Sequence, residues 1–264
     1  MNQTLAVIHN RRSTRKYADT PISAEEKDAI LQAAMRAPTA GNMMLYTIIE
    51  VENQALKDRL AVTCDNQPFI AKAPYVLLFL ADYQRWVDAF NWSGAPQICV
   101  EKGLLPRLPQ EGDLVLACCD ALIAAQTAVI AAESMGIGSC YIGDILENCE
   151  EHRAMFRLPR YTFPITLLCF GRPFSTREHP GLISRFDRRY IVHRDGYQTV
   201  EAADFPAMLE HAGQQFPGLQ PGEAAMKVAQ GIYTRKFVSD FSIEMTRSVK
   251  KWMDIWTGKD ESGG

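Results

Sequence analysis

The feature that most limits the possible folds of this chain is a near-continuous apolar run at residues 75–81, YVLLFLA. A run of this length is typical of a strand buried on both faces of a sheet. Two similar runs at residues 45–51 (LYTIIEV) and 165–170 (ITLLCF) predict further strands, and residues 139–142 predict a short one. The chain is therefore expected to fold around a central sheet.

Helical patterns lie between and after these strands. Ser23 and Glu26 have the spacing of a capping box, which predicts a helix running to about Arg36. Further helices are expected at residues 4–9, 54–64, 113–135, 145–158 and 203–214 and after residue 241. Helices and strands mix without strict alternation, which favours an α+β fold over a doubly wound sheet.

The composition limits the class of partner. The 264 residues are 47% hydrophobic, enough to bury a core, and the net charge of −3 shows no basic footprint for a nucleic acid or a membrane surface. Seven cysteines without a C-x-x-C pair indicate neither a disulfide framework nor a metal site, so we expect reduced thiols, a cytoplasmic protein and small-molecule partners. The apolar stretch at residues 114–132 contains Asp120, which favours a buried helix over a membrane span.

Residues 11–15 (RRSTR) are the first candidate for a binding site. In an extended backbone Arg11, Ser13 and Arg15 point to the same side, and two guanidinium groups with a hydroxyl between them suit a phosphate. Taken alone, these residues are better explained as a solvated basic face.

Three other segments bear on function. The small residues 37–42 (APTAGN) predict a turn that a ligand can approach. The aromatic segment 84–97 is expected to be a loop or short helix near a pocket, either as a lid or as surface packing. The apolar stripe of Met245, Val249, Trp252 and Trp256 needs a surface to pack on, for which we expect a second subunit.

Four separated stretches together resemble the family of FMN-dependent nitroreductases and flavin reductases. They are residues 11–15, 37–42, 141–144 (YIGD) and 171–173 (GRP) continuing to Arg185. The resemblance lies in their order and spacing, covers about residues 3–200, and is strongest to the larger, NADPH-preferring branch with a C-terminal extension.

The resemblance implies the architecture. It implies a central mixed, mainly antiparallel sheet flanked by helices. It also implies an FMN-binding nitroreductase-like domain at residues 1–200, and a C-terminal helical extension at residues 201–264 that packs on the partner subunit of a homodimer.

The resemblance also implies the FMN-binding residues. They are Arg11, Arg12, Ser13, Arg15, Pro38, Thr39, Ala40, Gly41, Asn42, Gln67, Tyr141, Ile142, Gly143, Asp144 and Arg185. By similarity, Arg11, Ser13 and Arg185 hold the phosphate and Arg12 lines the same loop. Arg15 reaches the pyrimidine edge of the flavin, where a cation favours the reduced form. Residues 38–42 reach the cofactor across the subunit interface, Gln67 bonds to the ring, and residues 141–144 run beneath it.

Two positions qualify the match. Ile183 stands where close relatives often have a lysine, so one partner of the phosphate is missing. Arg235 resembles an arginine that contacts the NADPH 2′-phosphate in relatives, but the basic loop that follows there is absent here. NADPH is therefore favoured over NADH only weakly.

The implied function is that of an oxidoreductase. Hydride would pass from NADPH or NADH through flavin N5 to a nitroaromatic, quinone or flavin acceptor by a ping-pong mechanism, with no catalytic side chain and no metal. The alternative is a non-catalytic flavin-binding or sensing protein of the same fold.

Overall fold

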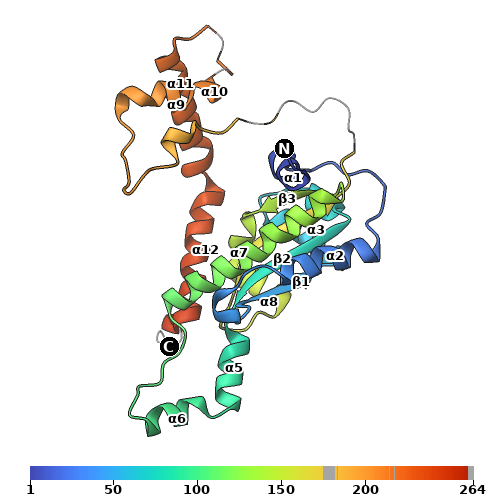
Figure 1. The fold of residues 1–264 in the computed structure, drawn as a ribbon, viewed down its shortest axis with the longest axis vertical. Coiled ribbons are helices and arrows are strands. Elements are labelled where there is room, and N and C mark those ends of the chain that lie inside the picture. The colour runs from blue at the N-terminus through green and yellow to red at the C-terminus, as the bar shows by residue number, and fades with distance from the viewer. Residues whose placement is uncertain (175–181, 183, 214, 217, 261–264) are drawn as a thin grey trace. The chain divides into compact units, whose positions relative to one another are not determined.

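The computed structural model describes residues 1–174, 182, 184–213, 215, 216 and 218–260 (Figure 1). The chain divides into two compact units, one of Met1–Glu178 with Glu244–Gly264 and the other of His179–Ile243. This division differs from the expected boundary at residue 200, because the last helix returns to the first unit. Each unit is described by itself below.

The first unit is built on a four-stranded sheet with the order β1-β2-β4-β3. The strands are β1 (Tyr46–Glu50), β2 (Tyr75–Asp82), β3 (Gly138–Ile142) and β4 (Thr162–Gly171). Neighbouring strands pair antiparallel. Every residue of β2 is buried, as its apolar run predicts. The four expected strands and the α+β class are confirmed.

Helices complete the first unit. They are α1 (Gln3–Asn10), α2 (Ala24–Met35), η1 (Ala40–Asn42), α3 (Gln54–Thr63), α4 (Phe69–Lys72), α5 (Gln84–Trp92), α6 (Ala95–Glu101), α7 (Glu111–Ser134), η2 (Asp144–Leu146), α8 (Cys149–Phe156) and most of α12 (Asp240–Thr257). The capping box of α2 is present, since Ser23 Oγ accepts from the Glu26 N–H and Glu26 Oε2 from the Ser23 N–H, at 3.2 and 2.9 Å.

Helix α7 lies across one face of the sheet, beside α2 (Figure 1). Its buried face is made of small side chains, which let it approach the strands closely: Ala121, Ala124, Ala125, Ala128 and Ala132. In the described part of the chain it is the one helix long and apolar enough to cross a membrane. Its alanine face packs inside the protein, as predicted for a buried helix.

The C-terminal helix α12 closes the core on the other side of the sheet. Trp252 and Trp256 are each 1% exposed. Their rings lie 5.8 Å from Phe163 and 5.6 Å from Tyr161, centroid to centroid. The apolar stripe therefore packs on its own chain, which its spacing alone could not reveal. Packing of this helix on a partner subunit stays a prediction, but Trp252 and Trp256, which motivated it, are already buried within their own chain.

The second unit is a small helical body. It contains η3 (Arg188–Tyr190), η4 (Ala202–Asp204), α9 (Phe205–Met208), α10 (Glu210–Gly213), α11 (Pro221–Ile232) and the π-helical η5 (Tyr233–Phe237). The expectation of one helix at residues 203–214 is wrong: Pro206 stands in the first turn of α9, where proline is tolerated, and the helix ends at Leu209 before α10 begins. Helix α11 was not predicted, although Pro221 in its first turn is a start signal.

Candidate functional site

The arginine-rich segment 11–15 runs along the outer edge of the sheet, beside β3. Ser13 and Ser139 form a parallel bridge, and the Thr14 N–H donates to the Ser139 carbonyl at 2.8 Å. Thr14 is buried, so its neighbours Ser13 and Arg15 face outward. The approach requires glycine at position 138, because a Cβ there would lie 2.2 Å from Thr14 Oγ1.

The side chains of Arg11, Ser13 and Arg15 meet around Cys140 on β3. Burial raises the pKa of the Cys140 thiol, while Arg15, Ser13 and Arg11 oppose that rise through charge and hydrogen bonding. Burial also raises the pKa of Tyr141 to about 12, again against the charge of Arg11. Arg11, Ser13 and Arg15 therefore all lie close enough to β3 to act on its side chains.

Gln67 lies near this group, since its neighbour Phe69 contacts Arg15 and its own side chain bonds Asp144. The Arg15 guanidinium lies 5.8 Å from the centre of the Phe69 ring, two residues beyond Gln67. The Gln67 amide donates to Asp144 Oδ2 at 2.8 Å and to the Cys64 carbonyl at 3.0 Å. We call this group the arginine half of the site. It comprises Arg11, Ser13, Arg15, Gln67, Tyr141 and Asp144.

The arginine half suits an anionic cofactor. Among the described residues, Arg11, Arg12 and Arg15 form no ion pair with a carboxylate, so three cations are left for an anion to neutralise. Burial raises the pKa of the Glu133 carboxyl group, and the positive charges of Arg11 and Arg12 oppose that rise. At Gly143, no atom lies within 4 Å of the position that a Cβ would take, so a ligand can reach the backbone there. Both features fit FMN, with its phosphate and flat ring.

The loop at residues 38–42 is held by one buried carboxylate on α7. Asp120 is 3% exposed. It accepts from the Thr39 hydroxyl, from the Ala40 N–H at 3.0 Å and from the Leu45 N–H at 3.2 Å. Gly41 and Asn42 have φ angles of 55° and 56°, in the left-handed region that tight turns require. We call residues 38–42 with Asp120 the loop half.

The two halves lie apart in one chain. The arginine half lies near α7 at two places, with Arg11 close to Glu133 and the Tyr141 hydroxyl donating to Gln126 Oε1 at 3.1 Å. The loop half contacts α7 at Asp120, thirteen residues before Glu133. That separation corresponds to about 20 Å along a helix axis. The structure therefore brings the predicted FMN residues into two groups, with Arg12 beside the first and Ile142 buried next to Tyr141. Arg185 and Arg235 belong to the second unit, and Ile183 lies outside the described residues.

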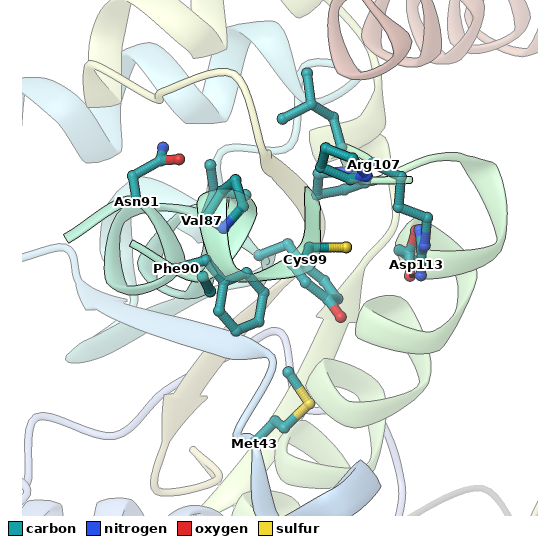
Figure 2. A pocket seen from close by; sticks show the side chains of 13 residues that line it. Met43, Val87, Phe90, Asn91, Cys99, Arg107 and Asp113 are labelled. Carbon is teal, nitrogen blue, oxygen red and sulfur yellow. Dashed lines mark hydrogen bonds and ion pairs between the residues drawn. The ribbon is translucent and has the colours of Figure 1, made fainter. Parts of the chain in front are cut away.

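A separate cavity of about 470 Å³ lies next to the loop half (Figure 2). Its walls come mainly from α5, α6 and the segment leading into α7, and they are mostly apolar: Met43, Tyr83, Val87, Phe90, Ala95, Pro96, Cys99, Pro106, Leu108 and Pro109. The Trp86 indole donates to the Met43 carbonyl at 2.7 Å, which ties α5 to the loop. The segment 84–97 thus forms α5 and the start of α6 beside a pocket, and its role as a lid stays a prediction.

The polar part of this cavity was not predicted. Arg107 and Asp113 line it, and two hydrogen bonds of 2.5 and 3.0 Å join them. The Arg107 guanidinium holds the pKa of the Asp113 carboxyl below its ordinary value. The pair is neutral as a whole, so the cavity suits an uncharged, apolar molecule. No spacing in the sequence indicated it, because the cavity forms only when two helices and a proline-rich loop meet.

Comparison with known proteins identifies the family. The chain belongs to the nitroreductase family, whose model matches residues 8–172. It is 32% identical to a Bacillus subtilis protein named FMN reductase (NADPH), over 78% of either chain. It is 29% identical to an oxygen-insensitive NADPH nitroreductase of Salmonella typhimurium, over 76% of this chain and 77% of that one. The B. megaterium NfrA2 structure matches 94% of this chain and 98% of its own, with a TM-score of 0.74 and 27% identity.

The expected family is confirmed, and with it the class of enzyme. The protein is an FMN-dependent oxidoreductase of the nitroreductase family that uses NAD(P)H as electron donor. The arginine half is the part of the described structure whose charge and open backbone fit that cofactor.

Proposed function

We propose that this enzyme transfers hydride from NAD(P)H to nitroaromatic, quinone or flavin acceptors, with donor and acceptor using one flavin site in turn. The observation that carries the proposal is the cluster of guanidinium groups beside β3, which form no ion pair within the described part of the chain and lie next to the open backbone at Gly143. We also place the enzyme in the cytoplasm, in keeping with seven free cysteines.

Each residue of the arginine half has a role in this proposal. Arg11 and Ser13 hold the phosphate through charge-assisted hydrogen bonds, with Arg12 beside them. Arg15 faces the pyrimidine edge, where its charge stabilises the negative charge that reduction brings. Gln67 orients the ring through its amide. FMN, when bound, supplies the hydride-accepting atom N5, so the protein contributes orientation and charge and needs no ionisable catalytic side chain.

A homodimer completes the site in this proposal. Each flavin takes its arginine half from one chain and its loop half from the other, which accounts for the position of Arg11 in a single chain, near Glu133 and about 20 Å along α7 from Asp120. The outer face of α7 offers a surface for a two-fold contact, with four exposed apolar side chains: Val115, Leu116, Leu122 and Ile123. A two-fold axis pairs such a surface with its own copy.

A non-catalytic flavin-binding protein is the competing function, and one preparation tests both. The purified protein should be yellow and should release FMN, not FAD, on heating. Adding NADPH without oxygen should bleach the bound flavin, and a nitroaromatic or quinone should then restore the colour. Bound FMN that NADPH leaves oxidised would support the binding protein. A colourless chain that FMN cannot reconstitute would contradict both functions.

A further inference from the structure

Glu147 is a buried carboxyl group, and one of its oxygens lacks a hydrogen-bond partner among the residues that the structure describes. It follows directly after η2 and is 5% exposed. Its Oε1 atom is fully buried and has no partner among the described residues. A buried, ionised carboxylate without partners is costly, so such a group either finds a cation or stays protonated.

The charged groups around Glu147 are acidic. Burial comes first among the causes that raise its pKa to about 7, followed by the carboxylates of Asp144, Asp65 and Glu244. Arg247 is engaged with Glu244 and Glu150. Arg247 is therefore not available to Glu147, whose carboxyl group instead forms a hydrogen bond with the Asp144 side chain that also raises its pKa. Two carboxyl groups in such contact favour a shared proton.

Two further titratable groups lie beside this cluster. The pKa of His152 is lowered, mainly by burial, and its ring nitrogens contact the Ile145 carbonyl and the Thr63 hydroxyl at 3.0 and 2.8 Å. Burial raises the pKa of the Cys64 thiol, and the charges of Asp144 and Glu147 add to that rise. Both groups are therefore neutral near pH 7 and do not neutralise Glu147.

Asp144 connects Glu147 to the arginine half. It lies three residues before Glu147, and its carboxylate accepts from the Gln67 amide at 2.8 Å. Asp144 also directly follows Gly143, where the backbone is open to a ligand. A path of polar groups thus leads from the protein interior to the residues that we assign to the flavin ring.

We propose that Glu147 and Asp144 share one proton, and that this pair takes up a proton from solvent when the flavin site gains electrons. The inference rests on the proposed function. Hydride transfer from NAD(P)H adds one negative charge to the site as NAD(P)⁺ departs, and proton uptake by the carboxyl pair balances that charge. The proton leaves again when an acceptor removes the electrons. Glu147 acts through Asp144 and Gln67, as a positioning residue and not as a catalytic one.

Proton uptake on reduction of the FMN-loaded enzyme tests the coupling. An indicator dye in weakly buffered solution near pH 7 would report the protons taken up per flavin as NADPH is added without oxygen. Glu147→Gln keeps the size of the side chain and should take up fewer protons, by as much as one per flavin. Glu101→Gln, an exposed carboxylate at the end of α6 and outside this cluster, is the matched control and should behave as wild type. Equal uptake in all three proteins would overturn the proposal.

A second measurement does not need flavin chemistry. An infrared pH titration of the protein without NADPH should show a carboxylic-acid band that disappears between about pH 5 and pH 9. Glu147→Gln should remove this band, and Glu101→Gln should keep it. If the protein never binds FMN but Glu147→Gln still removes the band, the proposed function is refuted and the shared proton is supported. The same band in all three proteins would refute the shared proton.

Discussion

The arginine half and the loop half differ in where the negative charge that balances their hydrogen-bond donors comes from. In the arginine half, guanidinium groups lie along a sheet edge without carboxylate partners among the described residues, so a ligand must supply the negative charge. In the loop half, the negative charge belongs to the protein, since Asp120 takes donors from Thr39, Ala40 and Leu45. One half is ready to attract a ligand, and the other is already satisfied and keeps its shape without one.

This difference indicates what each half contributes. An unpaired cationic edge gains most of its hydrogen bonds on binding, so it should govern affinity for the cofactor. A loop fixed by buried hydrogen bonds should govern the shape of the site and the stability of the fold. The following substitutions separate the two contributions, in order of decreasing effect.

Asp120→Ala should have the largest effect, on stability. It removes a buried carboxylate and leaves three donors without acceptors. We expect a loss of about 3 kcal/mol in the free energy of unfolding, because each hydrogen bond to a charged group contributes about 1.5–3 kcal/mol and removal of the buried charge offsets part of the three that are lost. Denaturant unfolding would measure it. Glu111→Ala, an exposed position on the same helix, is the control and should change stability little. A loss in Asp120→Ala as small as in that control would show that the loop does not depend on Asp120.

Glu147 can be compared with Asp120, because both are buried carboxyl groups and one oxygen of Glu147 lacks a donor among the described residues. Its pKa is raised to about 7 in the folded protein, so the folded state binds the proton more tightly. Stability from this group is fully present below the ordinary pKa and is lost as the pH rises through 7. Glu147→Gln should remove that loss. Its free energy of unfolding should exceed that of wild type by about 2 kcal/mol at pH 8 and should differ little from it at pH 4. Parallel pH profiles of the unfolding free energy would contradict this.

Arg11→Ala should lower FMN affinity about tenfold to hundredfold without lowering stability, because it removes a charge-assisted contact that forms only with the ligand. Fluorescence titration of the flavin-free protein would give the dissociation constants. Lys102→Ala removes an exposed cation from the end of α6 and serves as control. An affinity loss of the same size in the control would point to general electrostatics.

Arg15→Ala should have the smallest effect on binding and a larger one on rate. A cation at the pyrimidine edge gains most from charge that appears on reduction, so we expect flavin reduction by NADPH to slow about tenfold. Stopped-flow measurement without oxygen would separate this rate from FMN affinity. Loss of affinity with an unchanged reduction rate would assign Arg15 to the phosphate.

The sequence predicted those parts of the fold that depend on neighbouring residues. The apolar run of β2 and the Ser23–Glu26 capping box are local patterns, and both appear as expected. The role of Asp120 was not predictable, because the atoms it binds lie 75 to 81 residues away in the chain. The stripe of α12 was visible, but its spacing could not show that Phe163 and Tyr161 cover its tryptophans. The acidic surroundings of Glu147 likewise form only in the folded chain.

A subunit-mixing experiment tests the central claim, that each flavin site takes its arginine half from one chain and its loop half from the other. Arg11→Ala damages the arginine half, and Gly41→Val damages the loop half, since a β-branched residue is strained at a φ of 55°. Two differently tagged variants would be co-expressed, the mixed dimer isolated through both tags, and its FMN content measured. The account predicts that either variant alone binds FMN poorly, while the mixed dimer contains one intact site and regains half the wild-type FMN content. A mixed dimer with no more FMN than its parents would show that both halves of a site come from the same chain.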